Sequence, residues 1–276
     1  MFTKAAVLTA LTAATFAVAA PAMADTAATT VLPATNMESV LKAAQIDPRR
    51  ADDTQTPGAH DSVLLVEQAL QAKGLLASNL VDGYFGTSTI EAYSQYQKSL
   101  GYTGLDASGL PGKTSLEKLG EGRYTVTNPV SAGSQVTYHS KTLNTRTKAM
   151  LVAAEGIYGS QVVLTQGSYN AGGVDASAGT HDGGGAMDIS VSGISSANRT
   201  KLLTALRKVG FAAWLRTPAQ GFDYHIHAMA VSDPDLSSDA QHQTGDYYLG
   251  KNGLAGRGSD DGPQVTKVTW EEYQRG

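Results

Sequence analysis

The 276-residue sequence predicts an α+β protein, because helical and strand-like segments occur without a regular strand–helix–strand repeat. Apolar residues recur at helical spacing in several short segments that end at a glycine. Two other segments, QVVLTQGSYN and GFDYHIHAMAVS, have strand character, and the second alternates polar with apolar residues. These observations favour separate helical and mixed regions over one doubly wound sheet.

The first 24 residues are typical of a secretory signal. Lys4 supplies an early positive charge, an apolar run follows, and PAMA ends the segment with small residues. We therefore expect cleavage after Ala24, export of the mature protein and no stable insertion in the membrane, since no second apolar stretch follows. Residues 25–57 are rich in Ala, Thr, Pro and Asp and predict a leader or linker, with room for one short helix around Met37 to Ala44.

Residues 58–120 predict three short helices. Gly74 and Gly101 should end the first two, and Thr87 or Ser88 should cap the second. The third should begin at the LPG sequence. The apolar and aromatic positions expected to face the core are Val63, Val66 and Leu70, then Ile90, Tyr93 and Tyr96, then Leu116 and Leu119.

Part of this region, VDGYFGTSTIEAYSQYQKSLGYTGLDASGLPGKTSLEKL, resembles the peptidoglycan-binding domain found beside many cell-wall hydrolases. The likeness follows the pattern D-G-x-F-G-x-x-T, then A-x-x-x-[FY]-Q, then G-x-x-G-x-x-T-x-x-x-L. It implies a three-helix module that binds peptidoglycan, and a purely structural spacer is the alternative. Residues 121–137 are polar, with Gly, Pro and Ser, and predict a linker or an entry strand.

Residues 138–276 predict a second, mixed domain. LNTRTKAMLVAAEGIYG should form a helix that Asn144 or Thr145 caps and Gly156 ends. SSANRTKLLTALRKVGF should form another, with a leucine-rich stripe that ends at Gly210. The polar and aromatic tail contains His242, which has no spacing partner to suggest a metal ligand.

The stretch GTHDGGGAMD places His181 and Asp188 on either side of three glycines. Flexible glycines allow the chain to fold back, which would bring the two side chains together and leave room beside them for a substrate. On an extended strand, GFDYHIHAM points Asp223, His225 and His227 to one face. His181, Asp188 and His227 then form a common ligand set for catalytic zinc, although other divalent ions accept the same ligands.

The motif His181-x-x-Gly184-x-Ala186-x-Asp188, followed by His225-x-His227, resembles zinc D-alanyl-D-alanine carboxypeptidases and L-alanyl-D-glutamate endolysin peptidases. Vancomycin-resistance dipeptidases and the Hedgehog signalling domain are relatives of that family. The likeness covers roughly residues 138–255. It implies a small α+β domain with a central antiparallel sheet and one Zn²⁺ per chain, held by His181, Asp188 and His227. It also implies that His225 stabilises the charged intermediate or positions the substrate.

Three positions depart from the family pattern. Gly179 stands where a serine is frequent, and LTQGSYN lacks the usual arginine, so Gln166 is the expected donor there. Tyr224 stands where the acidic base is often found, and Asp223 is therefore the expected base. Further expected substrate contacts are Gly184, Tyr247 and Tyr248, although packing is the more usual role of aromatic residues in such a tail.

Together these features predict a secreted, cell-wall-associated zinc metallopeptidase, of carboxypeptidase or endopeptidase type, that hydrolyses the peptidoglycan stem peptide or cross-bridge. A non-catalytic, metal-containing wall-binding protein and a metal-stabilised interaction domain are the alternatives. The net charge of −4 argues against nucleic acid as a partner. The chain has no cysteine, so only His, Asp or Glu can hold a metal. The sequence leaves the oligomeric state open, with a monomer expected.

Overall fold

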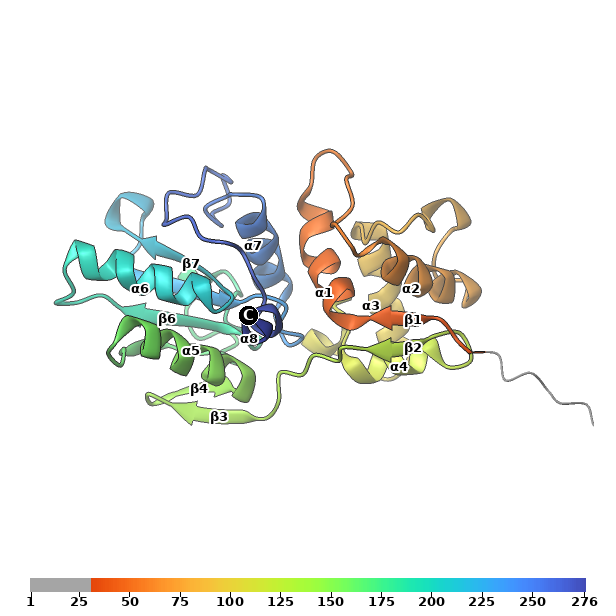
Figure 1. Cartoon of the computed structure of the whole chain (residues 1–276), viewed down its shortest axis with the longest axis horizontal. Coiled ribbons are helices and arrows are strands. Elements are labelled where there is room, and N and C mark those ends of the chain that lie inside the picture. The colour runs from red at the N-terminus through yellow and green to blue at the C-terminus, as the bar shows by residue number, and fades with distance from the viewer. Residues whose placement is uncertain (1–30) are drawn as a thin grey trace, which may run out of the picture. The chain divides into compact units, whose positions relative to one another are not determined.

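The computed structural model describes residues 31–276, and the predicted signal peptide lies outside this range (Figure 1). Leu32–Gly276 form one compact unit of helices and mainly antiparallel sheet, which is compatible with the predicted α+β class. Across residues 31–276, no helix has the length and the apolar character that crossing a membrane requires.

The N-terminal half is helical and contains the three expected helices. Gly86, rather than Thr87 or Ser88, is the N-cap of the second of them, α3, and no side chain caps it. The helices are α1 (Met37–Ile46), α2 (His60–Ala72), α3 (Thr87–Ser99) and α4 (Lys113–Gly120), with short 3₁₀ turns at Asp47–Arg49, Ser78–Leu80 and Gly104–Ala107.

Residues 34–49, expected to belong to a leader, are folded into this half. Strand β1 (Ala34–Asn36) pairs in parallel with β2 (Thr125–Thr127), and the Asn36 side chain caps α1 by accepting a hydrogen bond from the Glu38 amide at 3.0 Å. Val40 and Leu41 are fully buried in the core that α2 to α4 share. The helical region therefore begins at β1 and not at residue 58.

The C-terminal half contains a four-stranded antiparallel sheet in the order β5-β6-β8-β7. Its strands are β5 (Leu164–Gln166), β6 (Ala186–Ser190), β7 (Phe211–Arg216) and β8 (His225–Ala230). A hairpin of β3 (Gln135–Tyr138) and β4 (Lys141–Asn144) precedes it. The helices are α5 (Thr145–Tyr158), α6 (Ser196–Lys208), α7 (Ser238–Tyr248) and α8 (Trp270–Arg275), with 3₁₀ turns at Asp175–Ser177 and Pro218–Gln220.

Helix α5 begins as expected but ends later. The Asn144 side chain accepts a hydrogen bond from the Thr147 amide at 2.7 Å and caps the helix. Gly156 continues the helix, which ends at Gly159 with a left-handed φ of 91°. Glycine is tolerated in a helix interior at a cost of about 1 kcal/mol, so Gly156 did not have to be the stop signal.

Strand alternation gives the sheet two different faces. On one face Met187, Ile189, Ile226 and Ala228 pack in a core with the leucines of α5 and α6. The opposite face contributes Trp214 and Met229 to the core that also contains α1 and α7. The polar residues of β6 and β8 lie on this second face.

Helix α7 contacts both halves of the unit. Gln45 of α1 accepts hydrogen bonds at its Oε1 from the Thr244 hydroxyl at 3.0 Å and from the Ser232 amide at 3.2 Å. Arg49 donates two hydrogen bonds of 3.0 Å to the Asp246 carboxylate. These contacts hold α7, and with it one wall of the site described next, in a defined position.

Candidate metal centre

The three residues of the predicted ligand set converge on the second face of the sheet. Asp188 on β6 and His227 on β8 are direct partners in the strand register, so their side chains project from the same face. His181 approaches from the loop before β6, and its backbone carbonyl accepts a hydrogen bond from the Asn170 amide at 2.9 Å. Two rigid strands and one tied loop therefore build the group.

The ligand atoms have the spacing of a metal site. His227 Nδ1 lies 2.8 Å from Asp188 Oδ1, His181 Nε2 lies 3.4 Å from the same oxygen, and the two nitrogens are 3.3 Å apart. A tetrahedral ion with bonds of about 2.0–2.2 Å separates its ligand atoms by roughly 3.3 Å. This buried group could hold a metal ion.

The outer nitrogen of each imidazole has its own acceptor. His181 Nδ1 lies 2.9 Å from the Gly167 carbonyl oxygen, and His227 Nε2 lies 3.1 Å from the Gln243 side-chain oxygen. Both oxygens can only accept, so the neutral rings carry their protons on these outer nitrogens. The inner nitrogens then direct their lone pairs toward Asp188 Oδ1. These three electron-rich atoms repel one another, and a bound cation removes the repulsion.

The protonation states suit metal binding at neutral pH. Burial lowers the pKa of His227 to about 4 in spite of the neighbouring Asp188 carboxylate, so this imidazole is neutral. Burial by itself would raise the pKa of Asp188. Protons donated by the two imidazoles would hold that pKa well below its usual value, and a bound cation takes the place of these protons beside the carboxylate. The site therefore offers a neutral His227 imidazole beside the Asp188 carboxylate.

The glycine run has a packing role. A Cβ at Gly183 would come within 2.2 Å of the Asp235 carbonyl oxygen, and a Cβ at Gly184 within 2.7 Å of Asp235 Cβ and of the Tyr169 hydroxyl. Gly185 has a left-handed φ of 79°. These glycines therefore allow close packing and do not supply the expected room for a substrate. Gly184 packs against Asp235 and is not among the residues that line the cavity at the ligand group.

A cavity of about 970 Å³ opens at the ligand group. The three residues expected to act beside the metal line it: Gln166, Asp223 and His225. Gln166 is the register partner of Asp188, and its buried Nε2 has no hydrogen-bond partner among the described residues. His225 Nε2 lies 3.8 Å from Asp188 Oδ1, and its Nδ1 lies 2.7 Å from the Asp223 carbonyl oxygen. Asp223 itself is exposed, and β8 begins only at His225, so strand alternation does not govern the Asp223 side chain.

Two residues of this cavity were not predicted from the sequence. Gln243 reaches His227 from α7, and the buried Arg216 lines the cavity from β7. The strand alternation of FAAWLR, which ends in an arginine, was an available signal for Arg216. A single glutamine in a polar tail gave none for Gln243.

The tail aromatics and His242 lie elsewhere. Tyr247 is buried and meets Trp214 edge-on at 5.9 Å between ring centroids, and Tyr248 packs beside it. Neither tyrosine lines the cavity at the ligand group, so packing describes both better than the expected substrate contact. His242 is exposed, while the next residue, Gln243, faces the site.

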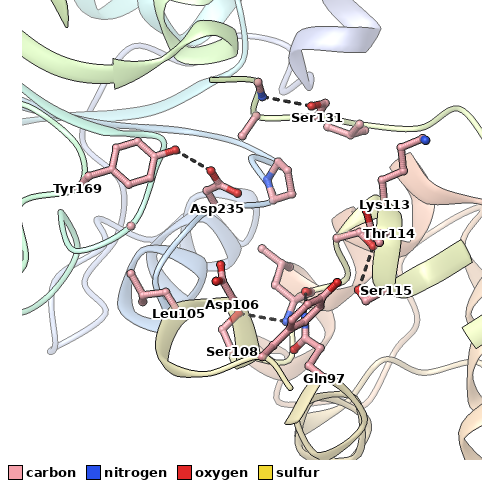
Figure 2. Close-up of a pocket in the computed structure, with 18 of the residues that line it drawn as sticks. Gln97, Leu105, Asp106, Ser108, Lys113, Thr114, Ser115, Ser131, Tyr169 and Asp235 are labelled. Carbon is pink, nitrogen blue, oxygen red and sulfur yellow. Dashed lines mark hydrogen bonds between the residues drawn. The ribbon is translucent and has the colours of Figure 1, made fainter. Parts of the chain in front are cut away.

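A separate cavity of about 720 Å³ is drawn in Figure 2. Its lining includes Gln97, Lys113 and Gly183, and Figure 2 shows the Tyr169 hydroxyl directed at the Asp235 carboxylate, 2.6 Å away. Gln97 donates a hydrogen bond from Nε2 to the Leu110 carbonyl oxygen at 2.8 Å in the same cavity. This cavity contains none of the three ligands.

Comparisons with protein families, with curated proteins and with solved structures give no match for the chain.

Proposed function

We propose that this chain is a secreted zinc peptidase that hydrolyses peptide bonds of peptidoglycan. The observation that supports the peptidase most directly is the convergence of His181 Nε2, Asp188 Oδ1 and His227 Nδ1 at the wall of an open cavity. A closed structural site would leave no approach for a substrate, whereas three protein ligands beside a cavity leave one position open.

The proposed substrate rests on the helical half. Residues 58–120 have the sequence pattern of a peptidoglycan-binding module, and their three helices occur at the expected places. In this proposal that module holds the wall, and residues 138–276 supply the zinc-peptidase sheet. Export follows from the signal-like residues 1–24.

His181, Asp188 and His227 would hold the ion, which when bound supplies a Lewis acid and a water acidic enough to attack at neutral pH. Gln166 donates a hydrogen bond from its free Nε2 to the oxygen of the scissile carbonyl, where negative charge develops. Such a donor lowers the barrier by roughly 3–4 kcal/mol in hydrolases.

Two groups compete for the role of proton acceptor. His225 donates from Nδ1 to the Asp223 carbonyl, so its neutral ring has a lone pair on Nε2, beside Asp188. The Asp223 carboxylate, the acceptor expected from the sequence, lines the same cavity. We propose that His225 takes a proton from the attacking water and passes it to the leaving amine as the C–N bond breaks. Comparison of His225→Gln with Asp223→Asn separates the two candidates. The larger loss of kcat identifies the acceptor.

The test is digestion of purified peptidoglycan by the mature protein, with and without a chelator, followed by mass spectrometry. Chelator-sensitive loss of terminal D-alanine would identify a carboxypeptidase, and cleavage within the stem or cross-bridge an endopeptidase. Absence of products from several wall types, together with one bound zinc per chain, would instead favour the non-catalytic wall-binding protein.

A further inference from the structure

Arg216 differs from the other buried arginines of the described chain. Arg207 lies 2.8 Å from the Asp260 carboxylate, and Arg146 lies 2.8 Å from that of Glu271. Arg216 is only 3% exposed, yet no carboxylate oxygen of residues 31–276 lies within 4.0 Å of its nitrogens. A buried charge normally has a partner, because desolvating it alone costs several kcal/mol.

The contacts of Arg216 hold its guanidinium in place without an ion pair closer than 4.0 Å among the described residues. Nη1 donates to the Asn252 carbonyl oxygen at 2.8 Å, and the guanidinium carbon lies 5.0 Å from the centre of the Trp214 ring. Nε and Nη2 have no acceptor among the described residues, and Arg216 is one of the residues that line the cavity of the ligand group. Two unpaired donors of one guanidinium are suited to a planar, negatively charged group.

The position of Arg216 fits one end of a substrate. Arg216 and His225 are register partners, so Arg216 lies on the sheet face of the metal ligands, on the edge strand β7. A second cavity, of about 540 Å³, shares Gln166, Val174 and Asp188 with the first but does not include Arg216. A peptide that crosses Gln166 from one cavity to the other therefore has only one part near Arg216.

We propose that Arg216 binds a carboxylate of the peptide substrate, on one side of the bond that is cut. This inference rests on the proposed peptidase function and specifies its substrate class: peptides with a carboxylate close to the scissile bond. The carboxylate is either the free C-terminus or the side chain of an interior acidic residue. The first source makes the enzyme a carboxypeptidase, and the second makes it an endopeptidase.

The experiment compares zinc-loaded wild type with Arg216→Met and Arg216→Lys on paired substrates. The first pair is N-acetyl-L-Lys-D-Ala-D-Ala and its C-terminal amide. The second pair has an amidated C-terminus and either glutamate or glutamine beside the scissile bond. In each pair one substrate has the carboxylate and the other has an amide in its place. In one of the two pairs, we expect Arg216→Met to lower kcat/KM about 100-fold for the substrate with the carboxylate and to leave kcat/KM for the amide unchanged. The affected pair identifies the source.

Arg216→Lys retains the positive charge but lacks the paired N–H donors of the guanidinium. Its loss of kcat/KM on the carboxylate substrate should be smaller than that of Arg216→Met. It also replaces Arg216→Met if circular dichroism shows that the methionine variant does not fold. Arg123→Met, in an exposed turn, is the matched control. Equal hydrolysis of acid and amide by the wild type, or equal loss of both in Arg216→Met, would overturn the proposal.

A binding measurement keeps this inference separate from the peptidase function. Isothermal titration on the zinc-loaded chain compares N-acetyl-D-alanine with its amide, and N-acetyl-glutamate with N-acetyl-glutamine, both with an amidated C-terminus. Preference for the acid of either pair that disappears in Arg216→Met supports the carboxylate site even if no wall preparation is hydrolysed. Equal affinity of acid and amide in both pairs contradicts it even if the peptidase is active.

Discussion

His227 lies directly opposite Asp188 across the β6–β8 ladder, with 2.8 Å between Nδ1 and Oδ1. The register of two antiparallel strands sets this distance, whereas the position of His181 depends on the preceding loop. The two parts of the ligand group should therefore respond differently to mutation: changes in the loop displace His181, and changes in the sheet displace Asp188 and His227.

Replacement of His181 tests the metal site itself. His181→Ala removes one of three protein ligands, and we expect zinc content to fall close to zero and turnover with it. Metal analysis of the purified protein after dialysis measures the first effect. His242→Ala, in which an exposed imidazole of α7 is removed, is the control. Zinc retained at full stoichiometry in His181→Ala would refute the ligand assignment.

Gln243 should act on the metal through His227. Gln243→Ala removes the acceptor of the His227 Nε2 proton, which frees the ring to rotate or change tautomer. We expect the dissociation constant for zinc to rise about 10- to 100-fold. Competition with a chromogenic chelator measures it, again with His242→Ala as the control. An unchanged affinity would show that His227 is oriented by other contacts.

Alanine substitutions at Gly184 and Gly156 should change the stability of the protein in opposite directions. Gly184→Ala brings a Cβ against Asp235, Tyr169 and Asn144, and we expect the free energy of unfolding to fall by about 1–3 kcal/mol. Gly156→Ala meets nothing within 4 Å inside α5 and should raise it by about 0.5–1 kcal/mol. Urea unfolding of the metal-free variants measures both. Equal stability of the two variants would contradict the packing role of the glycine loop.

Glu67 should make stability depend on pH. Burial raises the pKa of Glu67 from 4.5 to about 7, although the amides of Asp82 and Gly83 donate hydrogen bonds to it. Between these two values the folded state binds more protons than the unfolded state, so stability falls as the pH rises from about 4.5 to 7 and is constant above.

Urea unfolding at pH 5 and pH 8 tests this effect in the wild type and in Glu67→Gln. The neutral amide removes the loss of stability at high pH, while its oxygen can still accept both backbone hydrogen bonds. Glu117→Gln, on the exposed side of α4, should keep the slope of the wild type. An identical slope in Glu67→Gln would assign the pH dependence to another group.

Local sequence rules predicted helices α2 to α6 and all three residues that converge in the ligand group, but not α7 or α8. Periodicity located α2, α3, α4 and α6, and alternation on β8 placed His227 on the site face. Strand β6 was not predicted, because it has only five residues and directly follows a glycine run that is typical of a loop. Asp223 shows the limit of alternation, since that rule ends where the ladder ends.

The residues missed at the site come from distant parts of the chain. Gln243 and Arg216 reach the cavity through the packing of α7 and the pairing of β7, and neither relationship leaves a local pattern. Likewise, α1 lies in a segment whose composition resembles a linker. Its apolar face is explained only by contacts with α2 and α7.

The contact of α1 with α7 also affects how this protein folds. Gln45 of α1 and Thr244 of α7 are hydrogen-bonded and are separated by 199 positions. During synthesis, α1 therefore cannot contact α7 until nearly the whole chain has been made. Contacts of such long sequence separation form slowly and leave apolar surface uncovered meanwhile. The helical half, whose paired strands and core helices all lie within residues 34–127, should therefore form its core early, while the surface of α1 that contacts α7 stays uncovered until synthesis is nearly complete.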